Sequence, residues 1–175
     1  MKKAREGILP KGTLLWISNP NNIKTAFILP AGPRTIHVFK TGSVTVDLPE
    51  LLITFASPNN INVCVVSKDK LFTPALKNFH HGGMLCIGNV PVPEFDNQTP
   101  SQIRDNILRT IFDGAFSDDL NPKGFTMDEF KAILKKTKGE KINLSREDFF
   151  KRCSEIKNAT VENVIERIIK LGNDE

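Results

Sequence analysis

The sequence predicts an α+β fold in which an antiparallel β-meander packs on helices and a C-terminal helical extension follows. Two observations support this prediction. Turn-forming residues separate short strand-like runs over about the first ninety residues, and from Ser101 onward apolar residues recur at helical spacing. Strands followed by helices, rather than alternating with them, are typical of α+β proteins.

The strand-like part begins with three short runs, each followed by Pro, Gly or Asn. We predict strands at residues 13–18, 24–29 and 35–39, at the close spacing of a meander. Two longer apolar runs, 51–55 and 61–66, stand on either side of the turn-forming segment 57–60. They are predicted to form a central hairpin that is buried on both faces.

Helical periodicity starts after the Thr99-Pro100 signal, and the first predicted helix has Ile103, Ile107, Leu108 and Ile111 on one face. Two more helices are predicted to begin at the capping signals 126–129 and 145–148, and a last one covers 160–171. Domain organisation follows from this change of pattern. We expect a domain over 1–122 and a charged helical extension over 123–175.

Composition limits the class of protein. With 175 residues, 39% of them hydrophobic, the chain can bury one ordinary core. No apolar run approaches the roughly 20 residues of a membrane span, and no signal-peptide pattern opens the chain. Three cysteines fit reduced thiols better than a disulfide framework. A cytoplasmic protein without membrane contact is therefore expected.

The net charge of +4 comes largely from lysines between 131 and 141. Because no aromatic or arginine-rich residues interleave with them, a solvated helix face is the preferred interpretation and no nucleic-acid partner is expected. The chain has no CxxC pair for structural zinc. Segment 119–125 resembles the opening of a calcium loop, but its twelfth position is Phe130 rather than glutamate. No metal and no cofactor are predicted.

The candidate functional segment is 71–93, which is long, bears glycines and is polar at its centre. Its apolar residues are predicted to anchor it: Leu71, Phe72, Leu76, Phe79, Leu85, Ile87 and Val90.

Cys86 lies between Gly82-Gly83 and Gly88-Asn89, which allow the sharp bends that would present its thiol at a surface. From local context alone, however, a buried, inert thiol is the preferred interpretation, because free cysteines are among the most buried residues. Cys64 within a strand, and Cys153 within a helix near its apolar side, are expected to be core residues. His80 and His81 precede Cys86 closely enough for a ring to approach the thiol if the loop folds back, although a surface or turn position is the simpler interpretation.

Asn78 precedes Cys86 by eight residues, and Gly83-Met84-Leu85-Cys86-Ile87 surrounds the cysteine. This arrangement resembles that of ubiquitin-conjugating enzymes, in which the asparagine of a His-Pro-Asn tripeptide stands at the same distance before the catalytic cysteine. The wider sequence looks most like the prokaryotic family D of these enzymes. The resemblance covers roughly residues 12 to 122. Within that range, the stretches 47–51, 72–74, 86–89 and 112–117 are also similar.

The resemblance implies a ubiquitin-conjugating (UBC)-like fold and a cysteine-dependent acyl transferase. Cys86 would carry a ubiquitin-like modifier as a thioester and pass it to an amine, with Asn78 stabilising the oxyanion or holding the loop and His80 and His81 as lesser acid-base or loop-shaping candidates. The implied partners are a ubiquitin-like protein, an activating enzyme of the ThiF type and a metalloprotease of the same system.

Two departures from the family pattern keep other functions open. Leu76 and Lys77 occupy the positions of the histidine and proline, and the charged helices after about Phe125 have no counterpart. A UBC-like binding module or scaffold that has lost chemistry is the first alternative. A DNA-associated accessory protein that uses its lysine-rich helices is the second.

Overall fold

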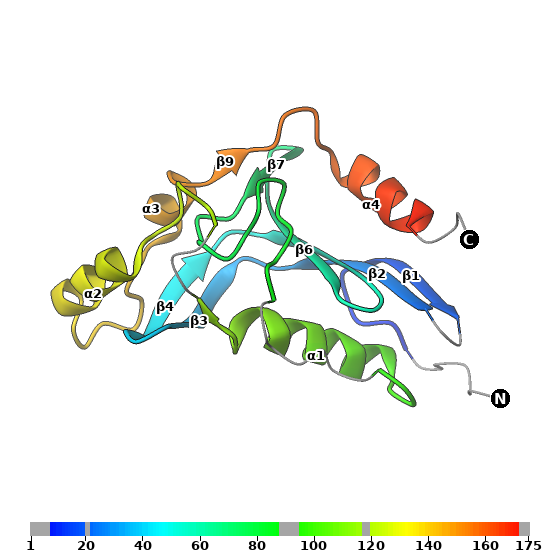
Figure 1. Cartoon of the computed structure of the whole chain (residues 1–175), viewed down its shortest axis with the longest axis horizontal. Helices are drawn as coiled ribbons and strands as arrows, with labels where there is room; N and C mark the ends of the chain where they lie inside the picture. The colour runs from blue at the N-terminus through cyan, green and yellow to red at the C-terminus, as the bar shows by residue number, and fades with distance from the viewer. Residues whose placement is uncertain (1–7, 20–21, 88–94, 117–119, 172–175) are drawn as a thin grey trace.

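The computed structural model describes residues 8–19, 22–87, 95–116 and 120–171. Its main element is a six-stranded antiparallel sheet, shown in Figure 1, with the strand order β1-β2-β5-β6-β7-β9. These strands are β1 (Thr13–Asn19), β2 (Asn22–Leu29), β5 (Leu51–Ala56), β6 (Asn60–Ser67), β7 (Lys70–Thr73) and β9 (Ser154–Glu155). The predicted α+β class with an antiparallel sheet is confirmed.

The sheet is not the simple meander that was predicted, because the chain leaves it after β2. It forms a separate three-stranded sheet from β3 (Gly32–Val38), β4 (Gly42–Leu48) and the parallel β8 (Ala115–Phe116), and returns to pair β5 with β2. Burial explains the order. All six residues of β5 are buried, so β5 needs a neighbour on each side, whereas β4 alternates between buried and more exposed residues.

The helices are α1 (Pro100–Phe112), α2 (Met127–Lys136), α3 (Arg146–Phe150) and α4 (Val161–Lys170). Their starts agree with the predicted signals. Thr99 and Thr126 each cap a helix through a complete capping box, and the Ser145 hydroxyl accepts from the backbone N–H of Asp148. Among the described residues, no helix is both long and apolar enough to span a membrane.

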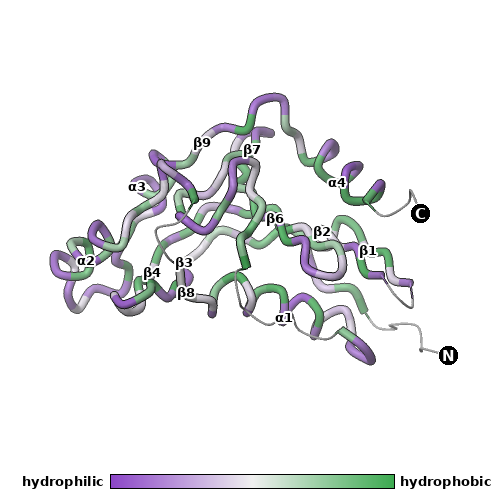
Figure 2. The backbone as a smooth tube through the Cα atoms, in the orientation of Figure 1, coloured by the Kyte–Doolittle hydropathy of each residue, from purple (hydrophilic) through white to green (hydrophobic). Residues whose placement is uncertain are grey.

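Helices cover both faces of the six-stranded sheet. Ile103 and Ile107 of α1 belong to the main core with Ile53 of β5, whereas Val161 and Val164 of α4 pack with Leu52. Successive strand residues point to opposite faces, so α1 and α4 lie on opposite sides, as Figure 1 shows. Figure 2 shows hydrophobic residues along β2 and hydrophilic ones on the outward turns of α4.

Residues after 122 also contribute to the main core. Phe125 packs against Phe130 of α2 and Phe149 of α3, with ring centroids 5.5 and 6.4 Å away. The Arg152 guanidinium lies 4.3 Å from the centroid of the Phe125 ring and pairs with Glu129, and this hydrogen bond lowers the pKa of the Glu129 carboxyl. The division at residue 122 stays a prediction, but the extension is packed on the sheet.

Cys153 does not lie in a helix, contrary to the prediction. Helix α3 ends at Phe150, and the chain turns and enters β9, where Ser154 pairs with Thr73 of β7. Pairing with a distant strand, which local periodicity cannot reveal, ends this helix early. The Cys153 side chain is half-buried against the main core.

The fully buried Phe149 tests whether the extension and the sheet form one cooperative core. We expect Phe149→Ala to lower the free energy of unfolding by about 3–5 kcal/mol, because it leaves a ring-sized cavity. Phe39→Ala removes a ring that is 48% exposed and should change the free energy of unfolding by no more than about 0.5 kcal/mol. Urea denaturation measures both, and equal small effects would contradict the shared core.

Candidate functional site

The candidate loop continues the sheet at the place where β7 stops. Strand β7 pairs only with Val65, Val66 and Ser67 of β6, so the same edge of β6 is open to another strand before Val65. Residues 83–85 occupy that edge. Leu85 N–H donates to the Ile61 carbonyl at 2.9 Å, and Val63 N–H donates to the Gly83 carbonyl at 2.8 Å, around an antiparallel bridge of Asn62 with Met84.

A second short strand pairs with the first. Cys86 N–H donates to the Asn78 carbonyl at 2.8 Å, and His80 N–H donates to the Met84 carbonyl at 2.9 Å. Phe79 and Leu85 form the bridge between these hydrogen bonds. Cys86 and Asn78 are therefore direct cross-strand partners, with side chains on the same face.

The turn that joins the two strands depends on glycine. Gly83 N–H donates to the His80 carbonyl at 3.0 Å, and Gly82 has φ +97°, as the third residue of a type II turn requires. Gly83 has φ +89°, and a Cβ there would collide with the Val63 carbonyl and lie 2.9 Å from Cys64 Sγ. The hairpin fits against β6 only without a side chain at this position.

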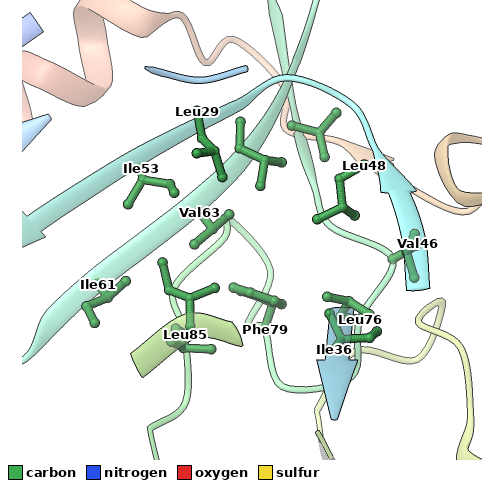
Figure 3. Packing of buried hydrophobic residues seen from close by; sticks show 14 of the residues in the cluster. Leu29, Ile36, Val46, Leu48, Ile53, Ile61, Val63, Leu76, Phe79 and Leu85 are labelled. Atoms are coloured by element: carbon green, nitrogen blue, oxygen red, sulfur yellow. The ribbon is translucent and has the colours of Figure 1, made fainter. Parts of the chain in front are cut away.

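One face of the hairpin anchors it in the main core. Phe79 is 1% exposed and Leu85 8% exposed, and Figure 3 shows them in one cluster with Val63 and Ile61. The predicted anchors agree with this. Leu71, Leu76, Phe79 and Leu85 are buried, Phe72 and Ile87 are partly buried, and Val90 lies outside the described residues.

The opposite face carries the candidate chemistry. Cys86 is exposed, Asn78 and His80 are half-buried, and Met84 is 43% exposed. All four share one side of the hairpin because they alternate with the buried Phe79 and Leu85. The structure thus brings Cys86, Asn78 and His80 onto one surface. The interpretation of Cys86 as a buried thiol, which local context favoured, is wrong.

His81 takes a different position, at the exposed tip of the turn. Together with His80 it lines a cavity of about 650 Å³ beside the hairpin. The other walls come from segment 120–123, Thr73 and β9. No three metal-ligating side chains come together within the parts of the chain that the structure describes.

Sequence reasoning missed Asn60 and Asn62, which lie on β6 beside the hairpin. Segment 57–60 was interpreted as a turn, and β6 as a strand buried on both faces. In fact Asn60 and Asn62 alternate with the buried Ile61 and Val63 and are only half-buried. This alternation was the available signal for a face that reaches solvent.

Segment 120–125 holds the residues before Asn78 in place. The buried Asn121 donates from Nδ2 to the Pro74 carbonyl at 2.8 Å and to the Leu76 carbonyl at 3.3 Å. The Lys77 carbonyl accepts from the N–H groups of Leu120 and Asn121 at 3.0 Å. The positions where the family pattern has histidine and proline are thus fixed by a segment distant in sequence.

The other two thiols differ from Cys86 in their surroundings. Cys64 is buried, as predicted, and burial raises the pKa of its thiol to about 12. Burial also raises the pKa of the half-buried Cys153 thiol to about 12. Neither forms a thiolate readily near neutral pH, so Cys86 is the accessible candidate nucleophile.

Comparison of the whole chain with models of protein families, with curated proteins and with solved structures finds no match in any of the three.

We expect iodoacetamide to label Cys86 alone in the native protein near neutral pH, because the other two thiols are shielded and stay protonated. Mass spectrometry should show a single adduct, none in Cys86→Ser, and three in wild-type protein unfolded in guanidinium. Labelling of native Cys64 or Cys153 at the rate of Cys86 would contradict this geometry.

The two glycines of the turn form a matched pair. Gly82→Ala meets no atom within 4 Å and should cost about 1–2 kcal/mol, because alanine disfavours a positive φ. Gly83→Ala adds the collision with β6 and should cost at least about 1 kcal/mol more. Chemical denaturation compares them, and equal costs would mean that the hairpin does not lie tightly on β6.

Proposed function

We propose that this chain is a ubiquitin-conjugating-like acyl transferase that accepts a ubiquitin-like modifier as a thioester on Cys86 and passes it to an amine. The observation that carries the proposal is the cross-strand pairing of Cys86 with Asn78, whose backbones are joined at 2.8 Å. It places a solvent-exposed thiol beside an amide that can donate hydrogen bonds.

The order of elements supports a UBC-like fold. Strands β1, β2, β5 and β6 are antiparallel neighbours in chain order, with the β3–β4 hairpin as an excursion between the second and third. The Cys86 hairpin follows, and α1 then packs on one face of the sheet. A strand meander, an active-site loop and a following helix come in the same order in the family that the sequence resembles.

The reaction is a pair of acyl transfers. The Cys86 thiolate attacks the carbonyl carbon of the modifier's C-terminal thioester on the activating enzyme, and the enzyme's own cysteine leaves as a thiolate. An acceptor amine then attacks the new thioester, loses a proton and expels the Cys86 thiolate. A thiolate is suited to both steps because it is a good nucleophile and a good leaving group.

Asn78 would stabilise the oxyanion that forms in each step. Its side chain projects from the strand position paired with Cys86, where an N–H donor can reach an oxygen on the reacting carbon. His80 lies two residues further along the same face and is a candidate to accept the proton from the amine. His81, at the tip of the turn, is more distant along the hairpin.

The missing His-Pro pair does not oppose this function, because other residues shape the loop. Leu76 is 3% exposed in the core, and Asn121 binds the carbonyls on both sides of Ala75. The partners that the proposal requires are a ubiquitin-like protein and an activating enzyme of the ThiF type. A metalloprotease of the same system would remove the modifier.

The test is reconstitution with a ubiquitin-like protein, its activating enzyme and ATP, followed by a non-reducing gel. We expect a thiol-sensitive adduct with wild type, Cys64→Ala and Cys153→Ala, and none with Cys86→Ala. Cys86→Ser should give an adduct that resists thiols, because its ester is not a thioester.

Asn78→Ala should slow both the charging of Cys86 and the transfer to an amine about 100-fold, because one oxyanion donor is lost in each step. A demonstrably charged activating enzyme that leaves the wild type unmodified would refute the catalytic proposal. A binding module without catalysis would then take its place.

A further inference from the structure

Cys86 has a second asparagine beside it, on β6. The antiparallel bridge of Asn62 with Met84 sets the register between β6 and the hairpin. Two residues back on β6 is Asn60, and two residues forward from Met84 is Cys86. Continued past its last hydrogen bond, from Leu85 N–H to the Ile61 carbonyl, the same register brings Asn60 opposite Cys86, on the side away from Asn78.

The hydrogen bonds agree with this row across three strands. Leu85 N–H points to β6 and bonds the Ile61 carbonyl, whereas Cys86 N–H points to the other neighbour and bonds Asn78. This alternation is that of a regular strand between two partners. Side chains opposite each other in such a row have Cβ atoms about 4.5–5.5 Å apart.

The Asn60 side chain is held with its donors available. Asn60 Oδ1 accepts from Asn62 Nδ2 at 2.9 Å, so the oxygen branch of its amide is engaged along β6. The nitrogen branch carries two N–H donors. Beyond Asn60 the row continues through Ala56 to Lys24, which is buried and bonds the Ile169 carbonyl of α4.

We propose that Asn60 is a second catalytic amide of this site, and that it donates to the acyl oxygen from the side opposite Asn78. The inference rests on the proposed function, since it assigns a residue to the same acyl transfer. When the Cys86 sulfur adds to the carbonyl carbon, the π electrons of the carbonyl move to oxygen. They return when the leaving thiolate departs.

With one amide on each side of the nucleophile, the oxyanion receives hydrogen bonds from donors on two strands of a hydrogen-bonded sheet. Such donors contribute most when they are positioned before the reaction, because no reorganisation is then required. The backbone hydrogen bonds of Leu85 with Ile61 and of Cys86 with Asn78, together with the Asn62 side-chain hydrogen bond, would position Asn60 in this way.

Asn60→Asp is the sharpest variant. Aspartate has the shape of asparagine and can still accept from Asn62 Nδ2, so it keeps the structural hydrogen bond but loses both N–H donors. Asn60→Ala removes the hydrogen bond with Asn62 as well as the two N–H donors. Asn59→Ala changes the exposed neighbour in the turn and is the matched control.

The probe is a small thioester of a glycine-terminated peptide with mercaptoethanesulfonate, and mass spectrometry follows acylation of Cys86 in the full chain. We expect Asn60→Asp and Asn60→Ala to lower the maximal acylation rate about 100-fold, with little change in the half-saturating probe concentration. Asn59→Ala should match wild type. Thermal unfolding of each variant shows that the fold is retained.

The outcomes separate this inference from the function on which it rests. An Asn60→Asp rate within twofold of wild type overturns the role of Asn60, and so does a wild type that the probe does not acylate. If the probe acylates wild type and Asn60→Asp is slow, but reconstitution with the modifier and its activating enzyme gives no adduct, only the conjugation proposal fails.

Discussion

The arrangement of the candidate site depends on the edge of β6 that β7 leaves open. Strand β7 is only four residues long, so the Ile61 carbonyl and the Val63 N–H need partners elsewhere. Residues 83–85 supply them, and residues 78–80 then pair with 84–86. A loop held by two backbone ladders keeps its side chains in fixed rows, which a loop held by side-chain contacts alone would not do.

This pairing divides the hairpin into an anchoring face and a presenting face. Phe79 and Leu85 are buried in the main core, and the same alternation brings Cys86 and Asn78 to the surface. A one-residue slip of the register would bury the thiol and expose the phenyl ring. The large cost of such a slip, in buried apolar area, is what holds the thiol at the surface.

Sequence reasoning succeeded where the determining interactions are local. The capping residues Thr99 and Thr126 start their helices as predicted, and the central β5–β6 hairpin is confirmed. It failed where pairing with a distant segment determines the local structure. Helix α3 ends before Cys153 because β9 pairs with β7, and β3 belongs to a second sheet rather than to the meander. In the site, the family resemblance indicated that Asn78 and Cys86 act together, but Asn60 needed the register of a third strand.

The buried side chain of Lys24 fixes the C-terminal end of α4 to the sheet. Lys24 is 4% exposed and donates to the Ile169 carbonyl in the last turn of α4 at 2.6 Å. Lifting that turn would break this hydrogen bond between β2 and α4. Fraying at this end of α4 is therefore opposed by a bond to the sheet as well as by the hydrogen bonds of the helix itself.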